Sequence, residues 1–196
     1  MNPLWNIPNL LTLLRILLIP VFVPVFYVPA QWSPYVAAAV FTVAALTDLL
    51  DGYLARRWGQ TSPLGAFLDP VADKLMVAVA LVLLVQQDPR ILLVLPAIVI
   101  IGREITVSAL REWMAEIGAR AQVAVSGIGK FKTTAQMVSI VMLLLRDSLV
   151  GPWVYYPGLV LLYLAAILTL WSMWLYLRAA WPALSGETNE KIVSEG

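Results

Sequence analysis

Residues 48–74 read DLLDGYLARRWGQTSPLGAFLDPVADK and contain four of the six aspartates in the chain. Asp48 and Asp51 are three positions apart, and Asp69 and Asp73 are four apart. On an α-helix, either spacing places both members of a pair on one face. The stretch therefore predicts two consecutive helices, each presenting a pair of carboxylates, and the two pairs can face each other.

The rest of the chain is strongly apolar. Of its 196 residues, 61% are hydrophobic and only 13% are charged, and the mean hydropathy is +0.83. A soluble globular domain carries about 25% charged residues, so this composition predicts an integral membrane protein. The net charge of +1 and the lack of a basic run argue against nucleic acid as a partner.

Apolar runs of membrane-spanning length recur along the chain. A spanning helix needs about 20 residues, and the runs predict spans at 9–29, 34–56, 70–87, 91–113, 132–147 and 153–179. The predicted fold class is all-α, an integral membrane bundle of six transmembrane helices. Pro20, Pro24 and Pro29 are predicted to kink or end the first span. Residues 1–182 are expected to form one transmembrane domain and residues 183–196 a polar cytoplasmic tail.

The distribution of lysine and arginine predicts the orientation of the bundle. Basic residues near span ends are retained on the cytoplasmic side. With the N-terminus inside, all of the 13 basic residues except Arg90 and Arg146 lie on or toward the inner face. The sequence thus predicts a multi-pass protein of the bacterial cytoplasmic (inner) membrane, with both ends of the aspartate stretch on the cytoplasmic side.

Four aspartates in an apolar chain need compensating partners. An aspartate at the centre of a bilayer costs about 2.5–3.5 kcal/mol, and protons, basic side chains or divalent cations could offset that cost. Two divalent ions would balance four carboxylates. The chain has no cysteine and no histidine, so any metal must be held by oxygen, which suits Mg²⁺ or Mn²⁺.

The small residues of the stretch point to a phosphate-bearing ligand. Mg²⁺ is usually bound by a few carboxylates together with substrate phosphates. Gly52, Ala55 and Gly65 leave room for a bulky ligand close to the backbone. Arg56 follows Gly52 by one helical turn and could fork onto phosphate oxygens.

At this point the sequence resembles a known family. The stretch is similar to the signature of the CDP-alcohol phosphotransferase family, with all eight fixed positions in place: Asp48, Asp51, Gly52, Ala55, Arg56, Gly65, Asp69 and Asp73. The resemblance extends over most of the chain. NIPNLLTLLRI at 6–16, GREITVSALREWMAE at 102–116 and GIGKFKTTAQM at 127–137 are similar to the branch of the family that makes phosphatidylglycerophosphate.

The resemblance implies a membrane enzyme. It would transfer the phosphatidyl group of CDP-diacylglycerol to sn-glycerol 3-phosphate, releasing CMP, with two Mg²⁺ or Mn²⁺ ions and as a homodimer. The implied metal ligands are Asp48, Asp51, Asp69 and Asp73, and Asp73 would also take the proton of the acceptor hydroxyl. The implied donor-binding residues are Gly52, Ala55, Arg56, Ser62, Gly65, Asn9 and Thr12.

Four basic residues are candidates for binding the acceptor phosphate: Arg103, Arg111, Lys130 and Lys132. Basic residues at inner span ends also anchor in lipid head groups, and that interpretation stays open for each of them. Arg103 has the better case for the site because it lies inside an apolar run. Glu104 could be the counter-charge of Arg103, or it could orient a site residue without contacting the substrate. Arg15 could face the site or pair with an acidic residue.

Two alternative functions remain open. The first keeps the chemistry and changes the acceptor to inositol phosphate, serine, choline or a second phospholipid. The second is a divalent-cation transporter, which also carries acidic residues inside helices. A transporter should hold its acids near mid-membrane with access from both sides, whereas these aspartates lie at span ends on one side, which favours the enzyme.

Overall fold

The computed structural model contains six α-helices. It describes residues 7–58, 63–117 and 127–184, apart from the side chains at 7–8, 49, 51–56, 58, 63–64, 66, 127–130 and 182–184. The helices are α1 (Ile7–Tyr27), α2 (Ser33–Trp58), α3 (Pro63–Gln87), α4 (Ile91–Glu116), α5 (Gly127–Leu144) and α6 (Gly151–Leu184). The predicted all-α fold is confirmed, and no strand occurs within the described ranges. Of the cytoplasmic tail predicted at 183–196, the first two residues belong to α6, and residues 185–196 lie outside the described part of the chain.

The largest difference from the predicted boundaries concerns α3. This helix begins at Pro63 rather than at residue 70, and α5 likewise begins at Gly127 rather than at 132. Apolar runs mark only the part of a helix that is suited to lipid, and both helices have a more polar first part. Proline suits the first turn of a helix because its missing N–H would have no intrahelical partner there.

Prolines inside the helices do not end them. Pro20 and Pro24 lie within α1, which ends at Tyr27, two residues before Pro29. Of the prediction that these prolines kink or end the span, Pro20 and Pro24 therefore do not end it, and a kink stays a prediction. Pro70 lies within α3. Such prolines are tolerated in membrane helices because neighbouring groups can satisfy the freed backbone carbonyls.

The bundle has the character of a membrane protein. Among the described residues, three helical segments are long and apolar enough to cross a bilayer: Asn9–Tyr27, Ile91–Glu116 and Gly151–Trp181. Shorter apolar helical stretches occur at Ser33–Asp48 and Phe131–Leu144. The chain therefore forms an all-α membrane bundle, while the count of six spans stays a prediction.

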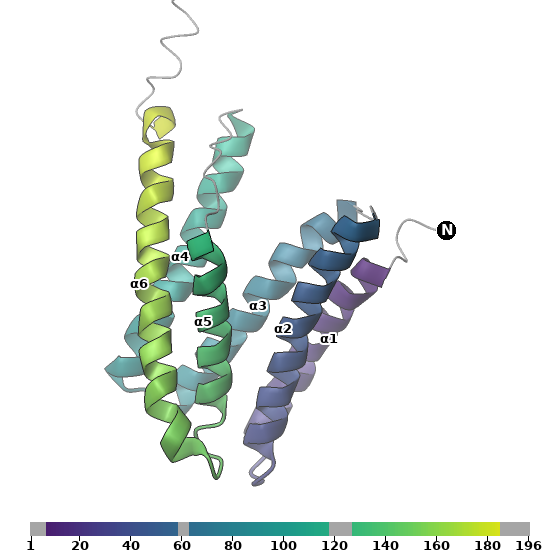
Figure 1. The fold of residues 1–196 in the computed structure, drawn as a ribbon, viewed down its shortest axis with the longest axis vertical. Coiled ribbons are helices and arrows are strands. Elements are labelled where there is room, and N and C mark those ends of the chain that lie inside the picture. The colour runs from purple at the N-terminus through teal and green to yellow at the C-terminus, as the bar shows by residue number, and fades with distance from the viewer. Residues whose placement is uncertain (1–6, 59–62, 118–126, 185–196) are drawn as a thin grey trace, which may run out of the picture.

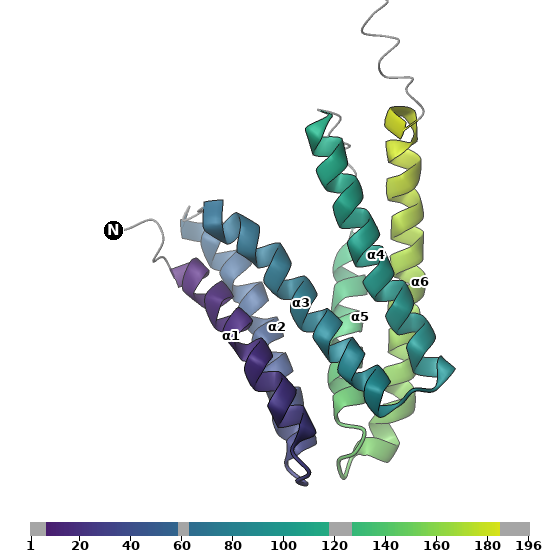
Figure 2. The ribbon, with the colours of Figure 1, turned by 180° about the vertical axis from the view of Figure 1, so that it is seen from behind.

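The helices form two groups that α3 connects. In both views, α1 and α2 run side by side, α4, α5 and α6 form the other group, and α3 passes from the first group to the second (Figures 1 and 2). The end of α2, the start of α3, the end of α4 and the start of α5 lie at one end of the bundle, which also holds the start of α1. The aspartate stretch is at this end, which we call the site end.

A buried apolar core joins the two groups. It includes Phe22, Phe41, Leu81, Ile100 and Leu162, all at most 1% exposed. The rings of Phe22 and Phe41 link α1 to α2, with centroids 6.3 Å apart. Lipid is as apolar as these side chains, so close packing rather than escape from water holds such helices together.

The contact between α5 and α6 depends on one glycine. The backbone carbonyl of Gly158 accepts a hydrogen bond of 2.7 Å from the buried Ser139 hydroxyl. A Cβ at Gly158 would lie 3.1 Å from Met142 Cβ and 3.2 Å from Leu143 Cγ. The absence of a side chain therefore lets the two helices approach closely enough for this hydrogen bond.

At the opposite end, a buried carboxylate joins two turns. Asp88, between α3 and α4, accepts hydrogen bonds of 2.7 Å from both Nε and Nη2 of Arg90 and one of 2.5 Å from the Tyr155 hydroxyl of α6. Arg146, after α5, approaches Asp88 to 3.2 Å. These contacts tie the α3–α4 turn to the α5–α6 connection.

Candidate active site

Helix α1 contacts one aspartate of α2 and one of α3. Asn9, Thr12 and Arg15 follow one another at three-residue spacing and share a face of α1. All three are buried. Arg15 Nη1 lies 2.7 Å from Asp48 Oδ1 on α2, and the Thr12 hydroxyl donates a hydrogen bond to Asp69 on α3. One polar face of α1 therefore orients one carboxylate from each aspartate pair.

Asp73 lies beside the same arginine. Arg15 and Asp73 both line a narrow cavity of about 10 Å³ that is otherwise mainly apolar. The Asp73 carboxylate is close enough to Asp48 for the two negative charges to repel each other, and Arg15 opposes this repulsion. The first and last aspartates of the stretch thus converge around one buried guanidinium.

A second cavity opens on the other side of Asp73. It has a volume of about 40 Å³ and is lined by residues of α3, α4 and α5: Asp73, Lys74, Val77, Glu104, Lys132, Thr133, Gln136 and Met137. A water needs roughly 10–15 Å³ measured in this way, so the cavity has room for a few water-sized groups. We call it the polar cavity.

Glu104 pairs with two buried cations around this cavity. Its Oε1 atom accepts a hydrogen bond of 2.7 Å from Arg103 Nη1 and lies 3.7 Å from Lys132 Nζ. Arg103 also donates a hydrogen bond of 3.1 Å to the Ser172 hydroxyl on α6. Glu104 is therefore positioned as the counter-charge of Arg103, which was one of its two predicted roles. Lys132 shares the same carboxylate.

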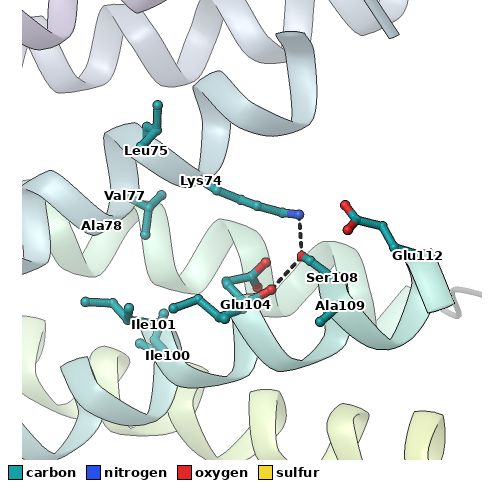
Figure 3. Close-up of a pocket in the computed structure, with 11 residues that line it drawn as sticks. Lys74, Leu75, Val77, Ala78, Ile100, Ile101, Glu104, Ser108, Ala109 and Glu112 are labelled. Atoms are coloured by element: carbon teal, nitrogen blue, oxygen red, sulfur yellow. Dashed lines mark hydrogen bonds between the residues drawn. The ribbon is translucent and has the colours of Figure 1, made fainter. Parts of the chain in front are cut away.

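An apolar groove lies between α3 and α4, next to the polar cavity. It has a volume of about 480 Å³, and Leu75, Ala78, Ile101 and Ile105 are among its lining residues. At its polar end the Lys74 ammonium reaches across to donate a hydrogen bond to the Ser108 hydroxyl (Figure 3). Ser108 in turn donates to the backbone carbonyl of Glu104, so α3 and α4 are joined where the groove meets the charged residues.

Comparison with known proteins identifies the family. A family model described as CDP-alcohol phosphatidyltransferase matches residues 5–175. The chain belongs to this family. It is 58% identical over 176 residues to a protein of Escherichia coli strain K12 named CDP-diacylglycerol–glycerol-3-phosphate 3-phosphatidyltransferase, an alignment that covers 90% of this chain and 95% of that relative. Proteins of the same name from Shigella sonnei and Shigella boydii match with the same identity and coverage.

The structure brings part of the family signature together. Asp48, Asp69 and Asp73 lie toward the site end, and Gly65 is buried in the first turns of α3. The side chains of five other predicted site residues and the whole of Ser62 lie outside the described part of the chain; those five are Asp51, Gly52, Ala55, Arg56 and Lys130. Their predicted roles stay predictions.

The described carboxylates fit a divalent cation. CDP-alcohol phosphatidyltransferases are generally dependent on a divalent metal. Within the described side chains, no three acidic residues come together closely enough to hold a metal by themselves, and Asp51 is not among those side chains. The donor set nevertheless consists of carboxylate oxygens, and Asp48 and Asp73 repel each other in a partly buried position. Such a site favours a cation.

The predicted acceptor residues separate into two groups. Lys132 lines the polar cavity, and Arg103 is linked to it through Glu104. Arg111 instead donates a hydrogen bond of 2.5 Å to the Tyr176 hydroxyl of α6 and stacks on the Tyr176 ring at 4.8 Å. Of the three acceptor candidates whose side chains the structure describes, Lys132 lines a cavity with Asp73 and Arg103 is joined to it, whereas Arg111 is not.

Two polar residues of this region were missed in the sequence. Thr133 and Gln136 line the polar cavity together with Lys132, and Gln136 is buried. A signal was available, because Lys132, Gln136 and Ser139 recur at helical spacing within an apolar run. A row of polar residues on one face of a membrane helix indicates that this face points away from lipid.

Proposed function

We propose that this protein transfers the phosphatidyl group of CDP-diacylglycerol to sn-glycerol 3-phosphate, giving phosphatidylglycerophosphate and CMP. One structural observation carries the proposal: Asp73, whose carboxylate interacts with that of Asp48, lines a polar cavity together with Lys132 and Glu104. This arrangement supports the proposal, because Asp73 would be a metal ligand and Lys132 would bind the acceptor phosphate. The relatives named above carry this activity in their names, at 58% identity over 90% of the chain.

The donor would lie across the aspartates. The proposed metal ligands are Asp48, Asp51, Asp69 and Asp73, and two Mg²⁺ or Mn²⁺ ions bound there would neutralise the pyrophosphate and the departing CMP. The remaining motif residues would bind the nucleotide and phosphates of the donor: Gly52, Ala55, Arg56, Ser62 and Gly65. The donor's acyl tails can remain in lipid while its head group enters from the membrane surface.

The chemical step is an in-line displacement without a covalent enzyme intermediate. A hydroxyl oxygen of the acceptor forms a bond to the phosphorus of the phosphatidyl group, and the pyrophosphate bond to CMP breaks, with CMP keeping the electron pair. The hydroxyl proton goes to the Asp73 carboxylate. General-base help of this kind contributes about 10²–10⁴-fold to a rate.

The acceptor phosphate would be bound by the cationic residues at the polar cavity. Lys132 is buried and lines the cavity with Asp73, which suits an acceptor whose phosphate and reacting hydroxyl are only a few bonds apart. Arg103 supports Lys132 through their common partner Glu104. Lys130 and Arg111 stay in the proposed set of acceptor residues, although Arg111 contacts Tyr176 and does not line the polar cavity.

The location of the site follows from the charge distribution. Arg90, in the α3–α4 turn, and Arg146, after α5, both pair with Asp88, and these connections lie at the end of the bundle opposite the end of α2 and the start of α3 (Figure 1). The other basic residues are predicted to lie on or toward the site end, and basic residues prevail on the cytoplasmic side of a membrane. We therefore propose that the site end faces the cytoplasm in a bacterial inner membrane. The six-span count and the homodimer implied by the family resemblance are further parts of this proposal.

The test is release of CMP by the purified protein from CDP-diacylglycerol and Mg²⁺, with one acceptor at a time. The acceptors are glycerol 3-phosphate, inositol phosphate and serine, beside a reaction without acceptor. We expect CMP release with glycerol 3-phosphate only. Turnover with another acceptor would keep the metal site and overturn the assignment of the basic residues, and no release with any acceptor would return the cation transporter to consideration.

A further inference from the structure

We propose that Glu104 is a positioning residue for both the proposed metal ligand Asp73 and the proposed acceptor-binding residue Lys132. It retains the Lys132 ammonium beside Asp73 and prevents Lys132 and Asp73 from forming an ion pair. The inference deepens the function proposed above and rests on it. Glu104 belongs to neither the family signature nor the basic residues assigned to the acceptor, so its role has to be argued from its contacts.

The first step of the argument is the position of Lys132. This residue is only 7% exposed, and it lines the polar cavity together with Asp73 and Glu104. A buried ammonium needs a counter-ion, since an unpaired buried charge costs several kcal/mol. Two carboxylates line the cavity, so Lys132 has two available partners, Glu104 and Asp73.

The second step is the geometry of the pair that forms. Lys132 Nζ lies 3.7 Å from Glu104 Oε1, which is longer than the 2.7–3.2 Å of a direct hydrogen bond. The same Oε1 atom accepts the shorter hydrogen bond from Arg103, at 2.7 Å. Arg103 thus fixes the Glu104 carboxylate, and the carboxylate attracts Lys132 without binding it tightly.

The third step is the local charge balance. Arg103 and Lys132 are both buried cations, and they share the single carboxylate of Glu104. One positive charge therefore remains uncompensated by this trio, next to a cavity large enough for a few oxygen atoms. An incoming phosphate can satisfy that charge without breaking the hydrogen bond between Arg103 and Glu104.

The last step concerns Asp73. Its carboxylate interacts unfavourably with the negative charges of Asp48 and Glu104 and favourably with Arg15 and Lys74. A further cation released beside it would still be attracted to it. Without Glu104, Lys132 would turn to Asp73, because both side chains line one cavity. Asp73 would then be neutralised by an ammonium, and its ability to bind a divalent metal would fall.

The experiment compares four proteins in detergent: the wild type, Glu104→Gln, the double variant Glu104→Gln/Lys132→Met, and Glu116→Gln as a matched control. Glu116 is an exposed carboxylate at the end of the same helix. Mn²⁺ binding is measured from the electron paramagnetic resonance signal of free Mn²⁺, which needs no turnover. The KM for glycerol 3-phosphate and kcat are measured in parallel.

We expect Glu104→Gln to weaken Mn²⁺ binding about tenfold, as is typical when a residue that orients metal ligands is changed, and to raise the KM for glycerol 3-phosphate. The double variant should recover Mn²⁺ binding, because no ammonium remains to occupy Asp73, but should keep the raised KM. Glu116→Gln should match the wild type in both measurements.

Two results would overturn the inference. The first is Mn²⁺ binding that is unchanged in Glu104→Gln. The second is Mn²⁺ binding that stays weak in the double variant, which would indicate general damage to the fold. If Glu104→Gln is not monodisperse, Glu104→Asp is used instead; it retains the charge and must bind Mn²⁺ as the wild type does, without the loss of about tenfold or more that follows when such a residue is removed. If instead the proposed function is wrong, the wild type will bind Mn²⁺ but release no CMP with glycerol 3-phosphate.

Discussion

The buried Arg15 of α1 and the partly exposed Asp48 of α2 form an ion pair, with Nη1 2.7 Å from Oδ1. Arg15 is 1% exposed and would be costly at this depth without an acidic partner. It also borders the cavity that contains Asp73. A single arginine of the first helix therefore provides the protein's own positive charge between two of the candidate metal ligands.

Removing this charge should make the fold more dependent on a divalent cation. In Arg15→Met, the Asp48 and Asp73 carboxylates repel each other without the guanidinium. Breaking a fully buried pair costs 3–5 kcal/mol, but Asp48 is 32% exposed, so we expect about 2 kcal/mol. The thermal midpoint in chelator should fall by about 4–8 °C, and Mg²⁺ should raise it more than in the wild type. Arg15→Lys keeps the charge, so its thermal midpoint should lie between those of the wild type and Arg15→Met. An equal rise of the midpoint with Mg²⁺ in all three proteins would contradict this explanation.

Thr12 distinguishes between nucleotide binding and metal-ligand positioning. Its hydroxyl donates to Asp69, so Thr12→Val should raise the Mg²⁺ concentration needed for half-maximal rate about tenfold, the lower end of the range for residues that orient metal ligands. Thr12→Ser keeps the donor and should stay close to the wild type. A raised KM for CDP-diacylglycerol with an unchanged Mg²⁺ requirement would instead support the donor-binding role predicted from the family resemblance.

The sequence predicted the helices well where they are apolar and less well where they carry the chemistry. Hydropathy located the apolar parts of all six helices, but it placed the start of α3 at residue 70 rather than at Pro63. Spacing alone indicated that Asp69 and Asp73 share a face. The interaction of Asp69 with Thr12 joins residues 57 positions apart, and such pairing depends on how the helices pack, which a hydropathy pattern does not encode.

The same limit explains the basic residues. Arg103 and Arg111 both lie on α4, and both were candidates for the acceptor in the sequence, with Arg103 favoured because it lies inside an apolar run. The structure separates them, because Arg103 pairs with Glu104 whereas Arg111 contacts Tyr176. Two of the six aspartates lie outside the signature, and one of these, Asp88, proves to be buried among two arginines and a tyrosine.

Asp88 should make stability fall at low pH. The hydrogen bonds from Arg90 hold the pKa of the Asp88 carboxyl well below its usual range, with further help from Tyr155 and Arg146 and against the effect of burial. A group whose pKa is lowered by folding stabilises the protein above its unfolded pKa of about 3.9. Its contribution should therefore be complete at neutral pH and decline as the pH falls below about 4.

The matching variant is Asp88→Asn. Its thermal midpoint at pH 7 should be several degrees lower than that of the wild type, and the difference should shrink as the pH is reduced from 5 to 3. Asp147→Asn, which changes a half-exposed aspartate at the same end, serves as the control and should have a smaller effect. A difference between Asp88→Asn and the wild type that is constant over this pH range would contradict the assignment.

Gly158 should not tolerate a large side chain. A Cβ there would already be within 3.3 Å of Met142 and Leu143, so Gly158→Leu should separate α5 from α6 and break the hydrogen bond from Ser139. Overpacking of this kind costs about 1–3 kcal/mol. Gly102→Leu is the control, because a Cβ at Gly102 meets nothing within 4 Å. Thermal melting in detergent should show a lowered midpoint for Gly158→Leu only.

The central claim is that carboxylates at the site end support metal-dependent phosphatidyl transfer, and CMP release at increasing Mg²⁺ tests it most directly. The wild type, Asp73→Asn and Asp88→Asn are compared with CDP-diacylglycerol and glycerol 3-phosphate. We predict no release in chelator, a rate for Asp73→Asn that is about 10²–10⁴-fold lower at saturating Mg²⁺, and a near-normal rate for Asp88→Asn below its melting temperature. A wild type that releases CMP at full rate in chelator, or an Asp73→Asn variant as active as the wild type, would contradict the claim.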